Sequence, residues 1–151
     1  MRTFTSLDEL RAATGEHLGY SDWHLIDQAR VNAFADATDD HQWIHVDVDR
    51  ARRESPFGGP VAHGYLTLSL LPWLTAEILS VSGVTMGVNY GLNRVRFPAP
   101  VLVGSRVRAG AQLTSLEDVP GGVQLVTTVT IEVEGQTKPA CVAESVARFY
   151  A

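Results

Sequence analysis

The sequence has little cysteine and no excess of positive charge. Its single cysteine, Cys141, can form neither an internal disulfide nor a thiolate metal cluster, and such usage is typical of a reducing compartment. We therefore expect a cytoplasmic protein. The 12 basic and 17 acidic residues give a formal net charge of -5, which favours neither nucleic acid nor an anionic membrane as a partner.

The sequence also lacks a continuous apolar run of membrane-spanning length. Its most apolar segment, Leu66 to Leu79, contains polar residues and Pro72, and it is shorter than the roughly 20 apolar residues of a membrane helix. The N-terminal segment has no apolar signal core and contains acidic residues, so we expect no export. Without repeats or a linker-like change in composition, residues 1–151 are predicted to form one domain.

The N-terminal part predicts two capped helices around one strand. Ser6 precedes a short segment with acidic residues in its first turn, which favours a helix N-terminus there. The mixed β-branched and aromatic residues 17–26 predict a strand. Asp27 is the expected N-cap of a helix that ends near Ala37 or Thr38.

The most apolar part of the chain is predicted to form a long central helix. Val61 to Ser80 is apolar on most faces, so we expect it to be enclosed, and Pro72 should bend it or remove one hydrogen bond. Beyond Gly83 the apolar period changes to two, as in strands. The four predicted strands are Val84 to Phe97, Ser105 to Glu117, Val123 to Glu134 and Pro139 to Tyr150.

This order of elements predicts an α+β fold in which a curved antiparallel sheet wraps around the central helix. Such a sheet leaves strand edges unpaired. Pairing two copies of the chain would protect these edges, and we therefore expect a homodimer.

The clearest candidates for catalytic residues are Asp40 and His45. They are five positions apart in a segment that cannot be one uniform helix, so a carboxylate and an imidazole could meet over one water molecule. Such a pair can remove a proton from water and return one elsewhere. The structural alternative is that Asp40 caps a short helix and His45 is a core histidine.

A third group is the backbone N–H of Gly64. The central helix should begin near His63 and Gly64, where the first turn offers unpaired N–H groups and the positive end of the helix dipole. A substrate carbonyl could approach this N–H closely because Gly64 has no side chain. Alternatively, Gly64 only eases helix packing.

Together, Asp40, His45 and the run from Pro60 to Gly64 resemble the hydratase motif of the MaoC-like, (R)-specific enoyl-CoA hydratases. The order and spacing match across roughly residues 27–79, and the later strands fit the hot dog fold of that family. The commonest form of the motif has Asn and Pro where this chain has Gln42 and Trp43. Asp40 to His45 is similar instead to the nodulation-protein-N-like branch.

The resemblance implies a hydro-lyase that adds water to a trans-2-enoyl thioester, or removes it from an (R)-3-hydroxyacyl thioester. Asp40 and His45 would hold the water, and the Gly64 N–H would bind the thioester oxygen. The family favours Asp40 as the base and His45 as the donor to C2. The implied substrate is carried by coenzyme A or acyl carrier protein, and no metal or redox cofactor is implied.

Other residues near the motif have open roles. Gln42, Trp43, His63 and Tyr65 could support the site, line the acyl-binding region or simply pack. His41 and His45, with nearby carboxylates, could be drawn as a metal site, but no further His or Cys completes a recognisable spacing. Three groups of arginines could bind coenzyme A phosphates or form solvated faces: Arg50, Arg52 and Arg53; Arg94 and Arg96; and Arg106 and Arg108.

Two competing functions stay open. A thioesterase of the same kind of fold would use a carboxylate to direct water at the thioester carbon. A non-catalytic acyl-thioester-binding or dehydratase-partner subunit would keep the fold without turnover.

Overall fold

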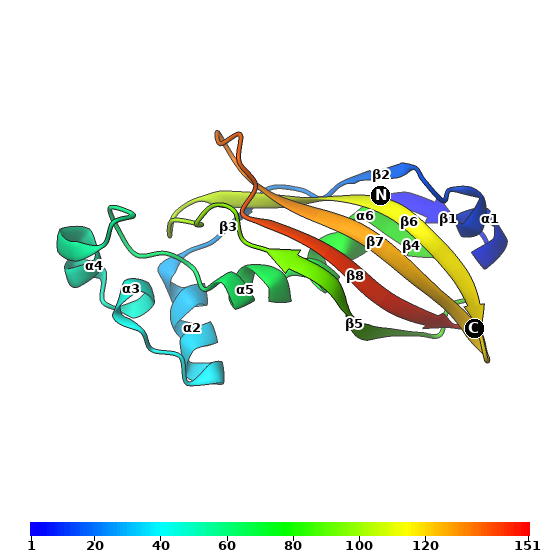
Figure 1. The fold of residues 1–151 in the computed structure, drawn as a ribbon, viewed down its shortest axis with the longest axis horizontal. Coiled ribbons are helices and arrows are strands. Elements are labelled where there is room, and N and C mark those ends of the chain that lie inside the picture. Colours follow the sequence, from blue (N-terminus) through cyan, green and yellow to red (C-terminus); the bar gives the residue numbers. More distant parts are fainter.

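The computed structural model describes residues 1–151, which form a curved sheet with helices against one face and beyond one end (Figure 1). The helices are α1 (Leu7–Ala12), α2 (Gln28–Thr38), α3 (Trp43–Val46), α4 (Val48–Glu54), α5 (Gly64–Ser69) and α6 (Leu71–Ile78). The strands are β1 (Arg2–Phe4), β2 (His17–Tyr20), β3 (His24–Leu25), β4 (Leu79–Val81), β5 (Met86–Arg96), β6 (Arg106–Val119), β7 (Gly122–Val133) and β8 (Cys141–Tyr150).

The main sheet is antiparallel and has the strand order β2-β6-β7-β8-β5, with β3 also paired to β6. The apolar period of two explains why Gly122–Val133 forms strand β7: every second residue is buried along its whole length. Its apolar face lies toward α5 and α6, which pack against the sheet. Strand β5 forms one edge of the sheet, and nearly all of its residues are exposed.

The predicted central helix begins at Gly64 but forms as two helices. Leu70 separates α5 from α6. Pro72 lies in the first turn of α6, where a backbone N–H has no partner within the helix, so its missing N–H costs no hydrogen bond. The expectation that the segment is enclosed on most faces is wrong for the single chain. Tyr65 is 72% exposed and Trp73 is 39% exposed, whereas the opposite face is buried.

The predicted α+β fold and the four C-terminal strands are confirmed, and the ends of these strands lie within two residues of the expected positions. Ser6 and Asp27 cap their helices, accepting hydrogen bonds from Glu9 N and Arg30 N. The strand expected at residues 17–26 is divided into β2 and β3. Strands β1 and β4 were not predicted, and they pair in parallel as a separate two-stranded sheet.

The buried side chains form a hydrophobic core of 26 residues between the helices and the sheet. Cys141 belongs to this core, as expected, and burial raises the pKa of its thiol to about 11. No helix combines the length and the apolar character needed to cross a lipid bilayer.

Leu74 provides a test of this core, because its side chain is completely buried on α6. We expect Leu74→Ala to lower the free energy of unfolding by roughly 2–5 kcal/mol through lost burial and a residual cavity. Urea denaturation at one fixed protein concentration measures this change. Leu25→Ala, at an exposed leucine of β3, is the matched control and should stay within about 0.5 kcal/mol of wild type. Equal effects of the two substitutions would contradict the assignment of Leu74 to the core.

Candidate active site

Asp40 lies in the loop that connects α2 to α3. The preceding residue, Asp39, ends α2 with a left-handed backbone (φ 59°), a conformation that Asp adopts more readily than most residues, and so turns the chain away from the helix. The side chain of Asp40 is 52% exposed. Its Oδ1 accepts a long hydrogen bond of 3.4 Å from Gln42 N. The carboxylate is therefore open to solvent, and it does not serve as the N-cap of a helix.

His45 lies on α3 and is only 7% exposed. Its Nδ1–H donates to the backbone oxygen of Val61 at 2.6 Å, which leaves Nε2 as the lone-pair nitrogen of the neutral ring. The backbone of the same segment is held by Gln28, whose Nε2 donates to His45 O at 2.8 Å. The imidazole is thus fixed in both orientation and tautomer.

The pKa of His45 lies below its ordinary value of 6.5. Burial is the largest cause, because it disfavours the charged ring. The hydrogen bond to Val61 raises the pKa, the nearby His63 lowers it, and the Asp40 carboxylate raises it. The net result is a neutral imidazole at physiological pH.

His63 joins the two predicted groups. Its ring is 3% exposed and stacks on His45 with a centroid separation of 3.8 Å and an interplanar angle of 23°. His63 Nε2–H donates to the backbone oxygen of Asp40 at 2.9 Å and lies 3.9 Å from Asp40 Oδ2. Polar atoms of Asp40, His45 and His63 all lie within 4.8 Å of one another. The predicted acid and base are therefore close in space, with His63 between them and the core.

The same three residues have the donor types of a metal site, but their rings are poorly arranged for one. A metal ion binds imidazole nitrogen in the ring plane at roughly 2.0–2.1 Å. The lone pairs of two nearly parallel rings 3.8 Å apart do not converge on such a point. His41, the other residue considered for a metal, lies outside the cluster and pairs with Asp36 at 2.8 Å.

Gly64 is the first residue of α5, and its N–H forms no hydrogen bond within the chain. A Cβ at this position would lie 3.2 Å from the Phe97 ring, so close packing also favours glycine here. Both readings of Gly64 thus have a physical basis. Helix α5 has only six residues, so an anion would be bound by local N–H groups more than by the dipole of a long helix.

The remaining candidate residues are less closely tied to the cluster. Gln42 is exposed at the start of α3, and Trp43 is half-buried beneath the guanidinium of Arg50 at 4.3 Å. Tyr65 is exposed and meets the Phe97 ring edge-on. Several arginines considered for phosphate binding are paired with carboxylates instead: Arg50 with Glu54, Arg106 with Glu134 and Arg108 with Glu132.

Three residues that support the site were not predicted. Gln28 holds the His45 backbone, Phe34 packs against the His63 ring, and Phe97 covers Gly64. Gln28 and Phe34 read in sequence as ordinary positions of α2. No pattern in the sequence indicates a role for either residue, because positions six apart do not lie on one face of a helix.

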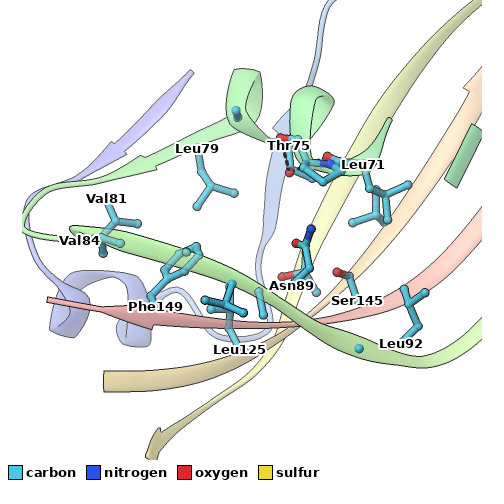
Figure 2. Close-up of a pocket in the computed structure, with 18 of the residues that line it drawn as sticks. Leu71, Thr75, Leu79, Val81, Val84, Asn89, Leu92, Leu125, Ser145 and Phe149 are labelled. Carbon is cyan, nitrogen blue, oxygen red and sulfur yellow. Dashed lines mark hydrogen bonds between the residues drawn. The ribbon is translucent and has the colours of Figure 1, made fainter. Parts of the chain in front are cut away.

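An apolar groove of about 680 Å³ runs beside the two central helices, opposite β5, β7 and β8 (Figure 2). It begins at Leu68, about one helical turn beyond Gly64, and does not include Asp40 or His45. The residues of its two walls include Leu71, Thr75 and Leu79 from α6 and its end, and Asn89, Leu92, Leu125, Ser145 and Phe149 from the sheet. The groove could hold an extended apolar chain whose polar end lies near Gly64.

This fold and this cluster define a hot dog protein with a carboxylate, an imidazole and a free backbone N–H at the start of its central helix. Residues 9–136 match the family model described as the MaoC like domain, and the chain belongs to that family. It is 58% identical over 152 residues to 3-hydroxyacyl-thioester dehydratase Z of Mycobacterium tuberculosis, with 100% of both chains covered. The enzyme class is hydro-lyase.

Two further relatives agree with this assignment. Nodulation protein N of Rhizobium meliloti is 46% identical over 149 residues, covering 94% of this chain and 89% of the relative. The solved structure of an (R)-hydratase from A. caviae involved in PHA biosynthesis superposes with a TM-score of 0.69 at 27% identity, covering 89% of this chain and 94% of that one. The resemblance to the MaoC-like family and its nodulation-protein-N-like branch is confirmed.

The lowered pKa of His45 can be measured directly. We expect the ring-carbon proton resonances of His45 to titrate with a midpoint below 6.5, since burial disfavours the protonated ring. NMR spectra recorded across pH, with the His45 signals identified by their loss in His45→Gln, give this midpoint. A midpoint at or above 6.5 would contradict the structure.

The same shift predicts the pH dependence of stability. Because the folded-state pKa is below the unfolded-state value, the unfolded chain takes up its proton at the higher pH. The free energy of unfolding should therefore fall as the pH drops below about 6.5, with no contribution from this group well above that pH. His45→Gln should show a smaller fall over this interval in urea denaturation.

Proposed function

We propose that the protein catalyses the (R)-specific hydration of trans-2-enoyl thioesters to (R)-3-hydroxyacyl thioesters, or the reverse dehydration. The observation that carries this proposal is the juxtaposition of the solvent-open Asp40 with a buried His45 whose Nε2 is free. Two proton-transfer groups beside one another suit a reaction that removes a proton from water as its oxygen bonds to C3 and places a proton on C2. The names of the dehydratase and (R)-hydratase relatives support the same reaction type.

The geometry supports a particular division of roles between the two groups, which share one proton. His45 Nε2 takes a proton from water, because its Nδ1–H is committed to Val61 O and the ring is neutral. The water oxygen bonds to C3 as the C2–C3 π electrons move toward the thioester oxygen. The proton held by His45 then passes to the Asp40 carboxylate, which delivers it to C2, so that both groups return to their starting states. This assignment reverses the roles that the family resemblance favours.

The thioester oxygen is proposed to accept a hydrogen bond from the Gly64 N–H. This group is unpaired at the start of α5, immediately after His63, and donors aimed at a developing oxyanion are among the largest contributions to catalysis. The reaction needs no redox cofactor. We also propose that it needs no metal, consistent with the stacked arrangement of His45 and His63.

The acyl part of the substrate is proposed to occupy the groove that begins at Leu68. A chain bound at Gly64 by its thioester would enter this groove after one helical turn, and the groove walls are mostly apolar. The thiol carrier, coenzyme A or acyl carrier protein, would remain on the open side of Asp40. Exposed arginines without carboxylate partners, such as Arg52 and Arg53, are candidates to contact its phosphates.

We further propose that the protein is a homodimer formed through β5. This edge strand is exposed along nearly its whole length and carries apolar residues such as Val88, Tyr90 and Leu92. An exposed apolar edge with unpaired backbone groups is a template for pairing with another strand. A second copy of the same strand would satisfy these groups symmetrically.

The catalytic roles predict the effects of substitution at Asp40 and His45. Asp40→Asn and His45→Gln should each lower kcat/KM for hydration of crotonyl-CoA by roughly 10²- to 10⁴-fold, the usual contribution of a general acid or base. The assay follows the loss of enoyl conjugation after dialysis against a chelator, with chiral analysis of the product. Asp39→Asn and His41→Gln are the neighbouring controls and should retain near wild-type rates.

The outcomes also separate the competing functions. Release of free thiol would indicate a thioesterase, whereas loss of conjugation without thiol release indicates hydration. Binding of crotonyl-CoA without any product would indicate a non-catalytic subunit. A loss of activity after dialysis against the chelator would refute the metal-free mechanism.

The dimer can be tested on β5 itself. Val88→Lys introduces a desolvated charge at the edge strand and should shift the mass measured by light scattering from two chains toward one. Leu25→Lys, at another exposed apolar residue, should leave the mass unchanged. A wild-type protein that is monomeric at all accessible concentrations would refute the proposed assembly.

A further inference from the structure

His63 is the most deeply buried member of the polar cluster, and the proposed reaction assigns it no proton to move. We propose that His63 is a positioning residue that holds Asp40 and His45 in register with one another. This inference rests on the proposed function, because it assigns a purpose to their relative placement. Three observations carry it: a tether to Asp40, a stack on His45, and the absence of a free, accessible nitrogen.

The tether is the hydrogen bond from His63 Nε2–H to Asp40 O at 2.9 Å. The other hydrogen bonds of the loop are local: Gln42 N–H to Asp40 Oδ1, His45 N–H to Gln42 O, and His41 with Asp36. The bond from His63 spans 23 positions and is the connection between this exposed loop and the core. Without it, Asp40 would be located by its neighbours along the chain: the end of α2, the left-handed turn at Asp39 and the long bond from Gln42 N–H.

The stack fixes the second partner. His45 and His63 lie face to face at 3.8 Å, while Phe34 packs on His63 at 4.9 Å between ring centroids. The His45 ring therefore has its plane set by His63 and its in-plane rotation set by Val61 O. A displacement of about 1 Å at a catalytic group can cost about 10²-fold in rate, so this two-point restraint is significant.

The two nitrogens of His63 are not available for catalysis. Its Nε2–H is donated to a backbone oxygen, and its Nδ1 is buried without a hydrogen-bond partner. An orphaned buried nitrogen is a cost that the fold tolerates for the placement of the ring.

The test uses two amide substitutions that differ in where they place a donor. In His63→Gln the amide nitrogen reaches approximately as far as Nε2 and can still donate to Asp40 O. In His63→Asn the amide nitrogen corresponds to Nδ1 and cannot reach it. We expect His63→Asn to lower kcat for crotonyl-CoA hydration at least tenfold, with KM within about twofold of wild type. His63→Gln should have a kcat much closer to that of wild type, because its amide can still donate to Asp40 O.

His63→Phe is the complementary variant, because it keeps a stacked ring and removes the donor. It should lose kcat as His63→Asn does. Thermal unfolding by circular dichroism confirms that each variant is folded at the assay temperature. If His63→Asn and His63→Gln are equally active, or equally impaired, the tether has no role in catalysis and the proposal is refuted.

A second readout does not depend on turnover. Amide hydrogen exchange of residues 39–42 should be faster in His63→Asn and His63→Phe than in wild type, and close to wild type in His63→Gln. A wild-type protein that lacks hydratase activity would refute the proposed function but leave this comparison intact. Unchanged exchange in all three variants would overturn the positioning role even if activity were lost.

Discussion

The hydrogen bond from His45 Nδ1–H to Val61 O is the interaction on which the site depends. It selects the tautomer of the imidazole and leaves Nε2 free. The acceptor is itself held, because Val61 bridges to Leu102 and its N–H donates to Ile44 O at 3.0 Å. The extended segment before α5 therefore connects the sheet, His45 and the start of the helix.

The site combines two opposite environments within a few ångströms. His45 is buried and its pKa is lowered, whereas the Asp40 carboxylate is half open to water. Burial favours the neutral form of the His45 ring, whereas solvent reaches the side chain of Asp40. Two titratable groups whose surroundings differ in this way are typical of acid–base catalysis.

Much of this arrangement could be predicted from the sequence, because it depends on local signals. Alternating apolar residues located the four long strands, side-chain caps located α1 and α2, and the glycine and proline run located the start of α5. The proximity of Asp40 and His45 followed from a motif shared with a known family. For the interruption of the central helix at Leu70, the only signal in the sequence was Pro72.

The remaining features depend on contacts between distant segments. The pairing of β1 with β4 joins residues more than 70 positions apart, and neither three-residue strand has a recognisable period. The bond from His63 to Asp40 spans 23 positions, and the pattern of residues on α2 does not indicate that Gln28 will hold His45. Tautomer, ring stacking and solvent exposure are likewise properties of the assembled fold and cannot be read from residue types.

The break at Leu70 divides the central helix into two parts that contribute different features. Helix α5 carries the Gly64 N–H at its start, whereas α6 provides much of the helical wall of the groove. Leu70 keeps a helical backbone and is bonded on both sides, from Leu70 N–H to Thr67 O at 3.3 Å and from Leu74 N–H to Leu70 O at 3.0 Å, so the two parts stay in line. Because the helical wall of the groove comes mainly from α6, substitutions there can change the shape of the groove without placing a new side chain beside Gly64. The groove can therefore vary within a lineage while the start of α5 keeps its sequence.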